Sequence, residues 1–528
     1  MPQPAAPAVP RLIHEAVARQ ARRRPAAVAL VHRGERVDYA TLDAAASTYA
    51  AGLWAAGVRP GTIVPVLLPR SPRLVAVLLA VLKCGAAYAA LDRRWPAQRI
   101  DQITGLVGAP VLVADGGTRG DVPRWVVPDE PLAHAASRGD EPPPVYVDGA
   151  AAAAVFFTSG SSGVPKGVLS PHRATTRLFP ARGFADFGPG RVVLQAAPVS
   201  WDAAGLELWG PLTSGGTCAI ADADYLLPDD LADLVASAGV DTAWLTSSLF
   251  NLLVDEDDPR RPCFAGVRQV VTGGERLSPT HVARFLARYP EVVLLNGYGP
   301  VESCVFATTH RVNAADCDRP DGIPLGVAVP ETTVYVLDGD RVAAPQAVGE
   351  ICLAGAGLAL GYVGDAAATA AAFTVLPLGD GEPVRGYRTG DLGYLDPDGL
   401  LHFRGRADRQ VKIAGHRIEP GEIESAARRL PGVREAAVVP VPAPGGGYDR
   451  LALFFTADAA DAADAADAAD AASDAADTGA AARTPAEVRR ALAATLPAHL
   501  VPQRVHRRAD LPTTTTGKLD RAALLAGL

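Results

Sequence analysis

Short apolar runs alternate along the chain with longer stretches in which apolar residues recur at helical spacing. This spacing predicts helices at Arg11–Arg22, Asp43–Leu53 and Pro72–Lys83, and strands at Val28–Val31 and Val64–Leu68. Thr41 is the expected cap of the second helix. Because strands alternate with helices of this length, the pattern predicts an α/β fold of mostly parallel sheets covered by helices.

The pattern is interrupted at about residues 457–482. Asp458–Asp477 is nearly pure Asp-Ala-Ala, with an aspartate at every third residue. Alanine favours helix, but a period of three spreads the charges over every face and leaves no apolar stripe. We expect a disordered acidic insertion between a strand at Leu451–Thr456 and a helix at Thr484–Leu496.

Composition narrows the class of protein. A length of 528 residues predicts more than one core, and 48% apolar with 20% charged residues is typical of a soluble globular protein. The net charge of −8 gives no electrostatic argument for binding nucleic acid or an anionic membrane. The six cysteines include no Cys-x-x-Cys pair, and no signal pattern or membrane-spanning apolar run occurs. We therefore expect a cytoplasmic protein.

The stretch Phe157–Gly167 follows a predicted buried strand at Ala150–Phe156 and carries the densest candidate chemistry. Glycines let backbone amides approach an anion closely, hydroxyl groups add donors and a lysine adds positive charge. These residues are Thr158, Ser159, Gly160, Ser161, Ser162, Gly163 and Lys166. The order differs from the common P-loop. A flexible Gly/Ser turn is the alternative, but the ordered series after a strand favours polyphosphate binding.

This stretch resembles the phosphate loop of the adenylate-forming enzymes, the superfamily of acyl-CoA synthetases, luciferases and nonribosomal peptide synthetase adenylation domains. Further segments resemble motifs of this superfamily in the same order. They are Val199–Trp209, Asn296–Glu302, Tyr387–Leu392, Gly405–Glu424 and Thr513–Arg521. Single residues depart from the patterns, among them Trp201 for Phe, Ala204 for Ser and Val301 for Thr. The resemblance covers nearly the whole chain apart from the acidic insertion.

The resemblance implies roles for individual residues. ATP would contact the phosphate loop and Asn296, Gly297, Tyr298, Gly299, Asp391 and Arg406. Within this set, Tyr298 would stack on adenine and Asp391 would accept the ribose hydroxyls. Glu302 would bind Mg²⁺, and the implied catalytic residues are Lys518, Glu302 and Thr158. Asp408 would be the hinge between a large domain at 1–407 and a small mobile α+β domain at 408–528, which carries the lysine.

The resemblance also implies an amino-acid pocket. Its positions are Asp202, Ala203, Leu206, Trp244, Val271, Gly273, Gly297, Val305 and Lys518. Asp202 would pair with the substrate's α-ammonium group; from the residues alone it could equally be a helix cap. No other pocket position except Lys518 is ionisable, so a charged substrate side chain would remain unpaired. Trp244 and Leu206 fill one side and the two glycines leave the other open, which predicts an aliphatic amino acid, valine before isoleucine or leucine.

The implied activity is formation of an aminoacyl-adenylate and pyrophosphate, then transfer of the aminoacyl group to the phosphopantetheine thiol of a carrier protein. The carrier would act in trans, because no Gly-Gly-x-Ser carrier motif follows Arg521. The chain would be a free-standing adenylation enzyme, or an excised domain, of nonribosomal peptide or related natural-product biosynthesis, with or without a small activator protein. The alternatives are an acyl- or aryl-CoA ligase, which has no use for Asp202, and a non-catalytic ATP-binding scaffold.

Overall fold

The computed structural model describes residues 11–116, 122–158, 165–180, 183–376, 383–443, 447–457, 483–513 and 519–528. It forms two compact units. One ends at Ala407; the other begins at Asp408 and also takes in Arg94–Asp101 and the described ends of Thr158–Lys166. The predicted residues Ser159, Gly160, Ser161, Ser162, Gly163 and Lys518, and the acidic insertion at 458–482, lie outside the described residues. No helix in the described part is long and apolar enough to cross a membrane.

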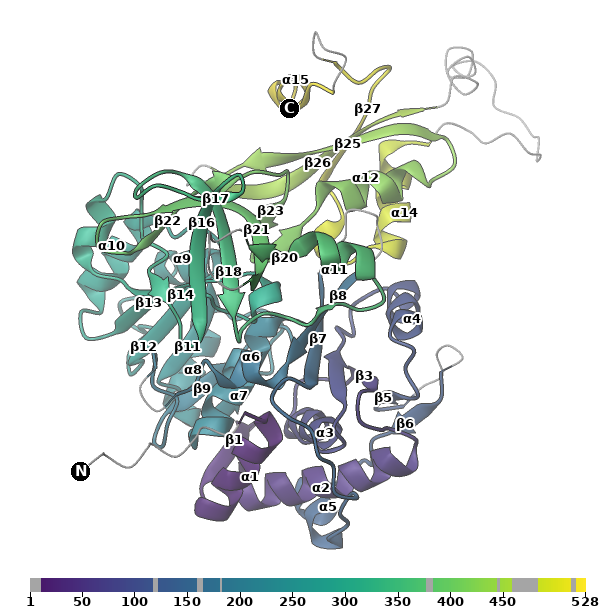
Figure 1. The fold of residues 1–528 in the computed structure, drawn as a ribbon, viewed down its shortest axis with the longest axis vertical. Helices are drawn as coiled ribbons and strands as arrows, with labels where there is room; N and C mark the ends of the chain where they lie inside the picture. The colour runs from purple at the N-terminus through teal and green to yellow at the C-terminus, as the bar shows by residue number, and fades with distance from the viewer. Residues whose placement is uncertain are drawn as a thin grey trace, which may run out of the picture. The chain divides into compact units, whose positions relative to one another are not determined.

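The first unit contains a sheet of nine strands in the order β15-β14-β13-β12-β11-β9-β10-β1-β2. Its strands are β1 (Val28–His32), β2 (Glu35–Asp38), β9 (Val192–Gln195), β10 (Thr217–Ile220), β11 (Thr242–Thr246), β12 (Gln269–Gly273), β13 (Val293–Tyr298), β14 (Thr308–Arg311) and β15 (Val327–Ala328). The strands from β1 to β13 in this order pair in parallel, whereas β2, β14 and β15 are antiparallel edges. Figure 1 shows β11, β12, β13 and β14 side by side.

A second sheet has seven strands in the order β19-β8-β7-β4-β3-β5-β6. They are β3 (Ile63–Leu67), β4 (Ala87–Ala90), β5 (Leu112–Ala114), β6 (Arg124–Val126), β7 (Ala152–Thr158), β8 (Lys166–Pro171) and β19 (Gly361–Tyr362). The pairs of β3 with β4 and β5, of β4 with β7 and of β5 with β6 are parallel, and β19 joins the edge antiparallel. The two sheets confirm the predicted mostly parallel α/β architecture.

Helices accompany these sheets. They are α1 (Ile13–Arg23), α2 (Tyr39–Ala55), α3 (Pro72–Lys83), α4 (Ala97–Leu106), α5 (Leu132–Arg138), α6 (His172–Thr176), α7 (Asp202–Ser214), α8 (Pro228–Ala238), α9 (Ser247–Asp255) and α10 (Pro279–Arg288). Helix α3 starts at a Ser71 cap and is buried from Leu74 to Leu82, as expected for a helix that is apolar on every face. It contacts β4 of one sheet and β1 of the other, so it lies in the core between them.

A third sheet of the first unit is antiparallel, which the alternating pattern did not predict. It consists of β16 (Thr332–Asp338), β17 (Arg341–Val342), β18 (Gly349–Gly355), β20 (Phe373–Leu376), β21 (Val384–Leu395) and β22 (Leu401–Arg406). Helix α11 (Ala366–Ala372) and the short 3₁₀ helices η1 (Val301–Ser303) and η2 (Ala314–Asp318) complete this unit. A turn at Ala356 and Gly357 follows β18.

The second unit is α+β, as expected. It contains the hairpin of β23 (Val411–Ile413) and β24 (His416–Ile418) and a sheet of β25 (Val433–Pro442), β26 (Tyr448–Ala457) and β27 (Arg504–Arg507). Its helices are α12 (Pro420–Arg428), α14 (Pro485–Thr495), α15 (Arg521–Ala526) and the 3₁₀ helix η4 (Ala498–Leu500). An apolar core between α12, α14 and the β25–β26 pair holds it together.

The predicted elements agree closely with these bounds, with one local correction. Helix α2 begins at Tyr39, and its cap is Asp38, which accepts a hydrogen bond from the backbone N–H of Thr41. Thr41 therefore lies inside the helix and is not its cap. Aspartate is a strong cap residue, and it stands three positions before the amide that it binds.

All six cysteines are free thiols, and only Cys317 is not fully buried. Burial raises the pKa of the Cys84 and Cys352 thiols to about 12, and that of Cys304 to about 11. These thiols are protonated at neutral pH. They form no disulfide in the structure.

Candidate active site

The predicted pocket residues meet on three adjacent parallel strands. In the register of β11, β12 and β13, Trp244 lies opposite Val271, and Gly273 lies opposite Gly297. Gly273 ends β12, and Gly297 is the penultimate residue of β13. In open α/β sheets, ligands bind at the carboxyl ends of parallel strands. The structure therefore places these four predicted positions on neighbouring strands, with the two glycines at the carboxyl ends where a ligand site is expected.

The two glycines do not leave one side of the pocket open, which corrects the sequence-based interpretation. A Cβ on Gly297 would lie 2.3 Å from the ring of Phe306, and a Cβ on Gly273 would lie 2.0 Å from the carbonyl oxygen of Gly297. The missing side chains are thus replaced by an aromatic ring and by close backbone packing. Phe306 is a site residue that the sequence analysis missed, because it follows the matched motif and nothing in its local pattern marks it.

Asp202 is not a helix cap. It is the first residue of α7, whose cap position is occupied by Trp201 without a side-chain cap bond. One carboxylate oxygen of Asp202, Oδ2, accepts a hydrogen bond of 2.9 Å from the backbone N–H of Val305. The Trp201 ring meets the Trp244 ring edge-on at 6.4 Å between centroids. Asp202 and Val305, predicted as pocket residues from distant parts of the chain, are therefore in direct contact.

The other described pocket positions are apolar, and all except Trp244 are buried, whereas Asp202 is half-buried. Ala203 is buried with Ala197 and Ala204 in a small cluster against Trp244, and Leu206 and Val271 belong to the main core. The described pocket positions other than Asp202 therefore offer apolar surface or backbone. This is the environment expected for an aliphatic substrate side chain, because a charged one would lose its hydration without gaining a partner.

Glu207 lies on the same helix as Asp202 and was not singled out from the sequence. Its Oε2 accepts hydrogen bonds from the backbone N–H groups of Ala196 and Ala197, at 3.1 and 2.9 Å, and from the Gln195 side chain at 3.3 Å. The side chain is completely buried, and this burial raises the pKa of its carboxyl to about 8. Glu207 thus fixes the segment that follows β9 against the helix that begins with Asp202.

The predicted nucleotide residues form a second cluster. The Tyr298 hydroxyl donates to Asp391 Oδ2 at 2.7 Å, and Arg406 Nη1 donates to Asp391 Oδ1 at 2.5 Å. Burial, followed by the Asp391 charge, raises the pKa of Tyr298 well above its ordinary value. Asp391 and Arg406 face each other in the antiparallel register of β21 and β22. The structure therefore brings Tyr298, Asp391 and Arg406 together although they come from two different sheets.

Glu302 lies on η1 and is almost completely buried. The Tyr362 hydroxyl donates to its Oε1 at 2.9 Å, and its backbone carbonyl accepts from Ala359 N–H at 2.8 Å. Among the described residues no group of three or more His, Cys, Asp or Glu side chains forms a metal cage. Mg²⁺ in nucleotide sites commonly has one or two protein carboxylates and completes its shell with phosphates and water, so a single oriented Glu302 fits this ion.

The remaining predicted residues are placed as follows. Asn296 donates from its side chain to the Pro324 carbonyl at 2.8 Å. Gly299 is required by close packing, because a Cβ there would lie 2.5 Å from the Val305 carbonyl oxygen. Thr158 ends β7 and is buried, and Lys166 begins β8 and is half-buried. Asp408 accepts from the backbone N–H of Gln410 at 3.1 Å.

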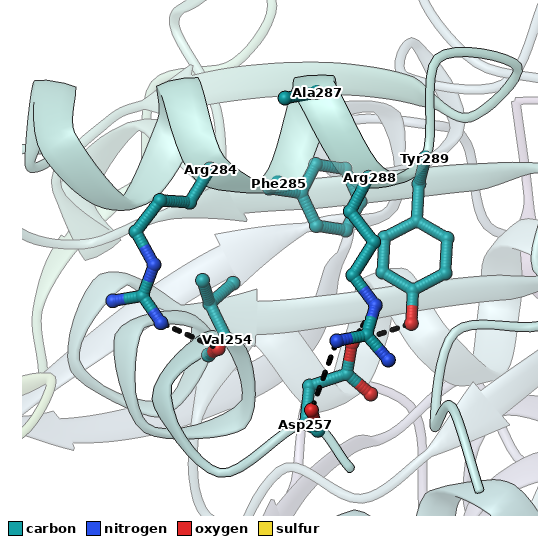
Figure 2. A pocket seen from close by; sticks show the side chains of 7 residues that line it. All are labelled: Val254, Asp257, Arg284, Phe285, Ala287, Arg288 and Tyr289. Carbon is teal, nitrogen blue, oxygen red and sulfur yellow. Dashed lines mark hydrogen bonds and ion pairs between the residues drawn. The ribbon is translucent and has the colours of Figure 1, made fainter. Parts of the chain in front are cut away.

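One pocket of the first unit has a volume of about 410 Å³ and contains no predicted site residue. Figure 2 shows that its polar side chains point toward one another: Arg288 and Tyr289 both bind Asp257, and Arg284 binds the Val254 carbonyl. One ion pair, Arg288–Asp257, and these hydrogen bonds engage the polar groups that line the pocket. We interpret it as a structural cleft between α9 and α10.

The sequence profile described as AMP-binding enzyme matches residues 17–363, and that of the AMP-binding enzyme C-terminal domain matches residues 422–518. The chain belongs to the family of AMP-binding enzymes and is an ATP-dependent, AMP-forming ligase. Within this family it groups with the adenylation domains of nonribosomal peptide synthetases, as its relatives indicate.

Tyrocidine synthase 3 of Brevibacillus parabrevis is 33% identical over 97% of this chain, and malpibaldin synthetase of Mortierella alpina is 36% identical over 99%. The chain spans only 8% and 9% of the length of these two relatives. Among solved structures, holo-PA1221, an NRPS protein containing adenylation and PCP domains, is 35% identical with a TM-score of 0.83. That match covers 98% of this chain and 84% of the other.

Proposed function

We propose that this protein activates an aliphatic L-amino acid, with valine preferred over isoleucine and leucine, as an aminoacyl-adenylate. The observation that carries the proposal is Asp202, whose carboxylate accepts the Val305 N–H and which is followed along α7 by an apolar cluster of Ala203 and Ala204. An α-ammonium group that leaves water needs such a partner, and removing one member of a buried charge pair typically costs about 3–5 kcal/mol.

In the proposed reaction, an oxygen of the amino-acid carboxylate attacks the α-phosphorus of ATP and the bond to the departing pyrophosphate breaks. Mg²⁺ bound at Glu302 would neutralise phosphate charge. Asp391 would orient the ribose and Tyr298 the adenine, while Asp202 would orient the amino acid. We assign to Lys518 the contact with the carboxylate and α-phosphate, and to Thr158 and the loop that follows it the binding of pyrophosphate. Positioning and charge neutralisation are the main terms in such a transfer.

The preference for valine rests on the volume of the pocket. Trp244 and Phe306 limit it with large rings, and a Cβ on Gly297 or Gly273 would collide with its surroundings. One methylene group is worth about 1–3 kcal/mol in such a pocket, so isoleucine and leucine should be activated more weakly and not excluded.

The second proposed step transfers the aminoacyl group to the phosphopantetheine thiol of a carrier protein acting in trans. The solved relative PA1221 contains a PCP domain beside its adenylation domain, which supports a carrier as partner. We assign to Asp408 the hinge at which the second unit would turn between the two steps.

The test is amino-acid-dependent exchange of labelled pyrophosphate into ATP, with every proteinogenic amino acid and with carboxylic acids that lack the α-amino group. We expect a maximum for L-valine or a close aliphatic relative. Asp202→Asn should abolish this dependence, whereas Asp229→Asn, on the exposed face of α8, should not. Exchange only with acids lacking the amino group would refute amino-acid activation and indicate a CoA ligase. An aromatic or charged best substrate would refute the pocket assignment.

A further inference from the structure

Two adjacent residues of the site loop have a backbone conformation that their side chains disfavour. Cys304 has φ 51° and Val305 has φ 61°. Among the described residues, this is the one place where two neighbouring non-glycine residues both have positive φ. For a β-branched residue such as Val305 this region is a genuine outlier, and such conformations persist only where the surroundings impose them.

Arg177 supplies this constraint. It follows α6, and its Nη2 donates to the carbonyl oxygens of Ser303 at 2.7 Å and Phe306 at 2.9 Å, which flank the strained pair on either side. The side chain is only 4% exposed. Burial lowers the pKa of Arg177 to about 10, so the guanidinium remains charged at neutral pH. A charged donor to two backbone carbonyls is among the stronger hydrogen-bond arrangements.

Gly357 makes room for this guanidinium. A Cβ at that position would lie 2.1 Å from Arg177 Nη2 and 2.4 Å from Nε. The turn after β18 therefore needs glycine for a reason unrelated to its own backbone: a side chain there would displace the arginine from the two carbonyls.

The conformation of Cys304 and Val305 determines two contacts in the candidate pocket. The Val305 N–H donates to Asp202 Oδ2, and the next residue, Phe306, lies with its ring against Gly297. Relaxing Cys304 and Val305 to an ordinary conformation would turn the Val305 N–H away from the carboxylate. Asp202 would then lose the hydrogen bond that fixes one of its oxygens.

We propose that Arg177 is a positioning residue for amino-acid recognition: through the Ser303 and Phe306 carbonyls it holds Val305 in the conformation that orients Asp202. This inference rests on the proposed function, because it takes Asp202 as the partner of the substrate ammonium. Arg177 acts in this proposal through backbone carbonyls, and it lies outside every motif quoted from the sequence.

The experiment compares Arg177→Met, Arg177→Lys and Gly357→Ala with the control Arg288→Met. The control removes an ion pair with buried Asp257 in the cleft of Figure 2, away from the predicted site. Pyrophosphate exchange gives kcat and KM for L-valine and for ATP separately, and 3-methylbutanoate reports on substrate without an ammonium group. Thermal unfolding of each variant measures its general loss of stability.

We expect Arg177→Met to raise KM for L-valine about tenfold or more, to change KM for ATP less than threefold, and to reduce the preference for L-valine over 3-methylbutanoate. Gly357→Ala should produce the same pattern by displacing the guanidinium. Arg177→Lys should raise KM for L-valine less than Arg177→Met does, because its ammonium group can still donate to the two carbonyls. Arg288→Met should lower the unfolding temperature without changing the ratio of the two KM values.

A purely structural role would give a different result. If Arg177→Met and Gly357→Ala lost stability while both KM values stayed those of the wild type, or changed as in Arg288→Met, the proposal would be wrong. If Arg177→Met did not fold, Arg177→Lys and Gly357→Ala would decide by the same KM ratio. Absence of exchange by the wild type with every amino acid would instead overturn the proposed function itself.

Discussion

Replacing Glu207 by glutamine is expected to remove a pH dependence from the stability of the protein. The carboxyl is completely buried, which raises its pKa from 4.5 to about 8 in the folded chain. Below about pH 4.5 both folded and unfolded chains carry the proton. Between about pH 4.5 and 8 the unfolded chain loses it while the folded chain retains it, so the free energy of unfolding falls as pH rises.

The magnitude follows from the shift. One pKa unit corresponds to about 1.4 kcal/mol, so the wild type should lose about 1.4 kcal/mol per pH unit in this window and at most about 5 kcal/mol in total. The geometry suits a neutral group. Oε2 accepts three hydrogen bonds of 2.9–3.3 Å, whereas Oε1 receives only one contact, of 3.3 Å, from the Ala197 N–H that also donates to Oε2. A glutamine can therefore place its oxygen at the Oε2 position and keep these bonds.

The assay is urea unfolding of wild type and Glu207→Gln at pH 5, 6, 7 and 8. The difference between the two proteins is the relevant quantity, because other titrating groups cancel in it. We expect the free energy of unfolding of Glu207→Gln to increase steadily relative to that of the wild type as the pH rises. The reasoning would be refuted if this difference did not change with pH, or if the wild type became more stable relative to the variant as the pH rose. Either result would mean that the three N–H donors and the nearby Arg70 charge keep the carboxylate ionised.

Further predictions concern the nucleotide cluster and the pocket. Asp391→Asn should raise KM for ATP by about tenfold while KM for the amino acid changes little, because Tyr298 and Arg406 lose a charged acceptor; equal changes in both constants, measured by pyrophosphate exchange, would contradict this. Tyr362→Phe removes the hydrogen bond to Glu302 and should cost about 1 kcal/mol in kcat/KM for Mg²⁺-ATP, with a shifted Mg²⁺ dependence; an unchanged Mg²⁺ titration would argue against it. Gly297→Ala should destabilise by about 1–3 kcal/mol in thermal unfolding and raise KM for the amino acid, since its Cβ would collide with a phenyl ring; a stable variant of unchanged KM would show that the ring moves easily.

Periodicity located those elements of the two parallel sheets in which apolar residues dominate, such as α3 and β1. Helix Pro72–Lys83 has the predicted bounds, and the strand predicted at Val28–Val31 ends one residue later. The antiparallel third sheet was missed. Its strand β21 (Val384–Leu395) carries several charged and glycine residues, so it gives no apolar run to detect.

In the candidate site, only the residues that lie in recognised motifs could be predicted from the sequence. Asp202 and Val305 were both named from the sequence, and so were Tyr298 and Asp391, yet no local pattern contains the hydrogen bonds between them. These contacts join residues about a hundred positions apart and depend on how the sheets pack. Phe306, Glu207 and Arg177 could not have been found from patterning, because a buried charge or ring in a helix or loop looks like any other until its partners are known.

The sequestered cysteines have a consequence for an enzyme proposed to handle a carrier thiol. Thiol exchange requires an exposed thiolate, whereas these side chains are free but protonated, and all except Cys317 are buried. The protein should therefore not trap its carrier as a mixed disulfide under mild oxidation. A cysteine introduced at Tyr146, which is 94% exposed, would react with a maleimide ahead of all six native thiols, so the wild-type chain already serves as a background for single-site labelling.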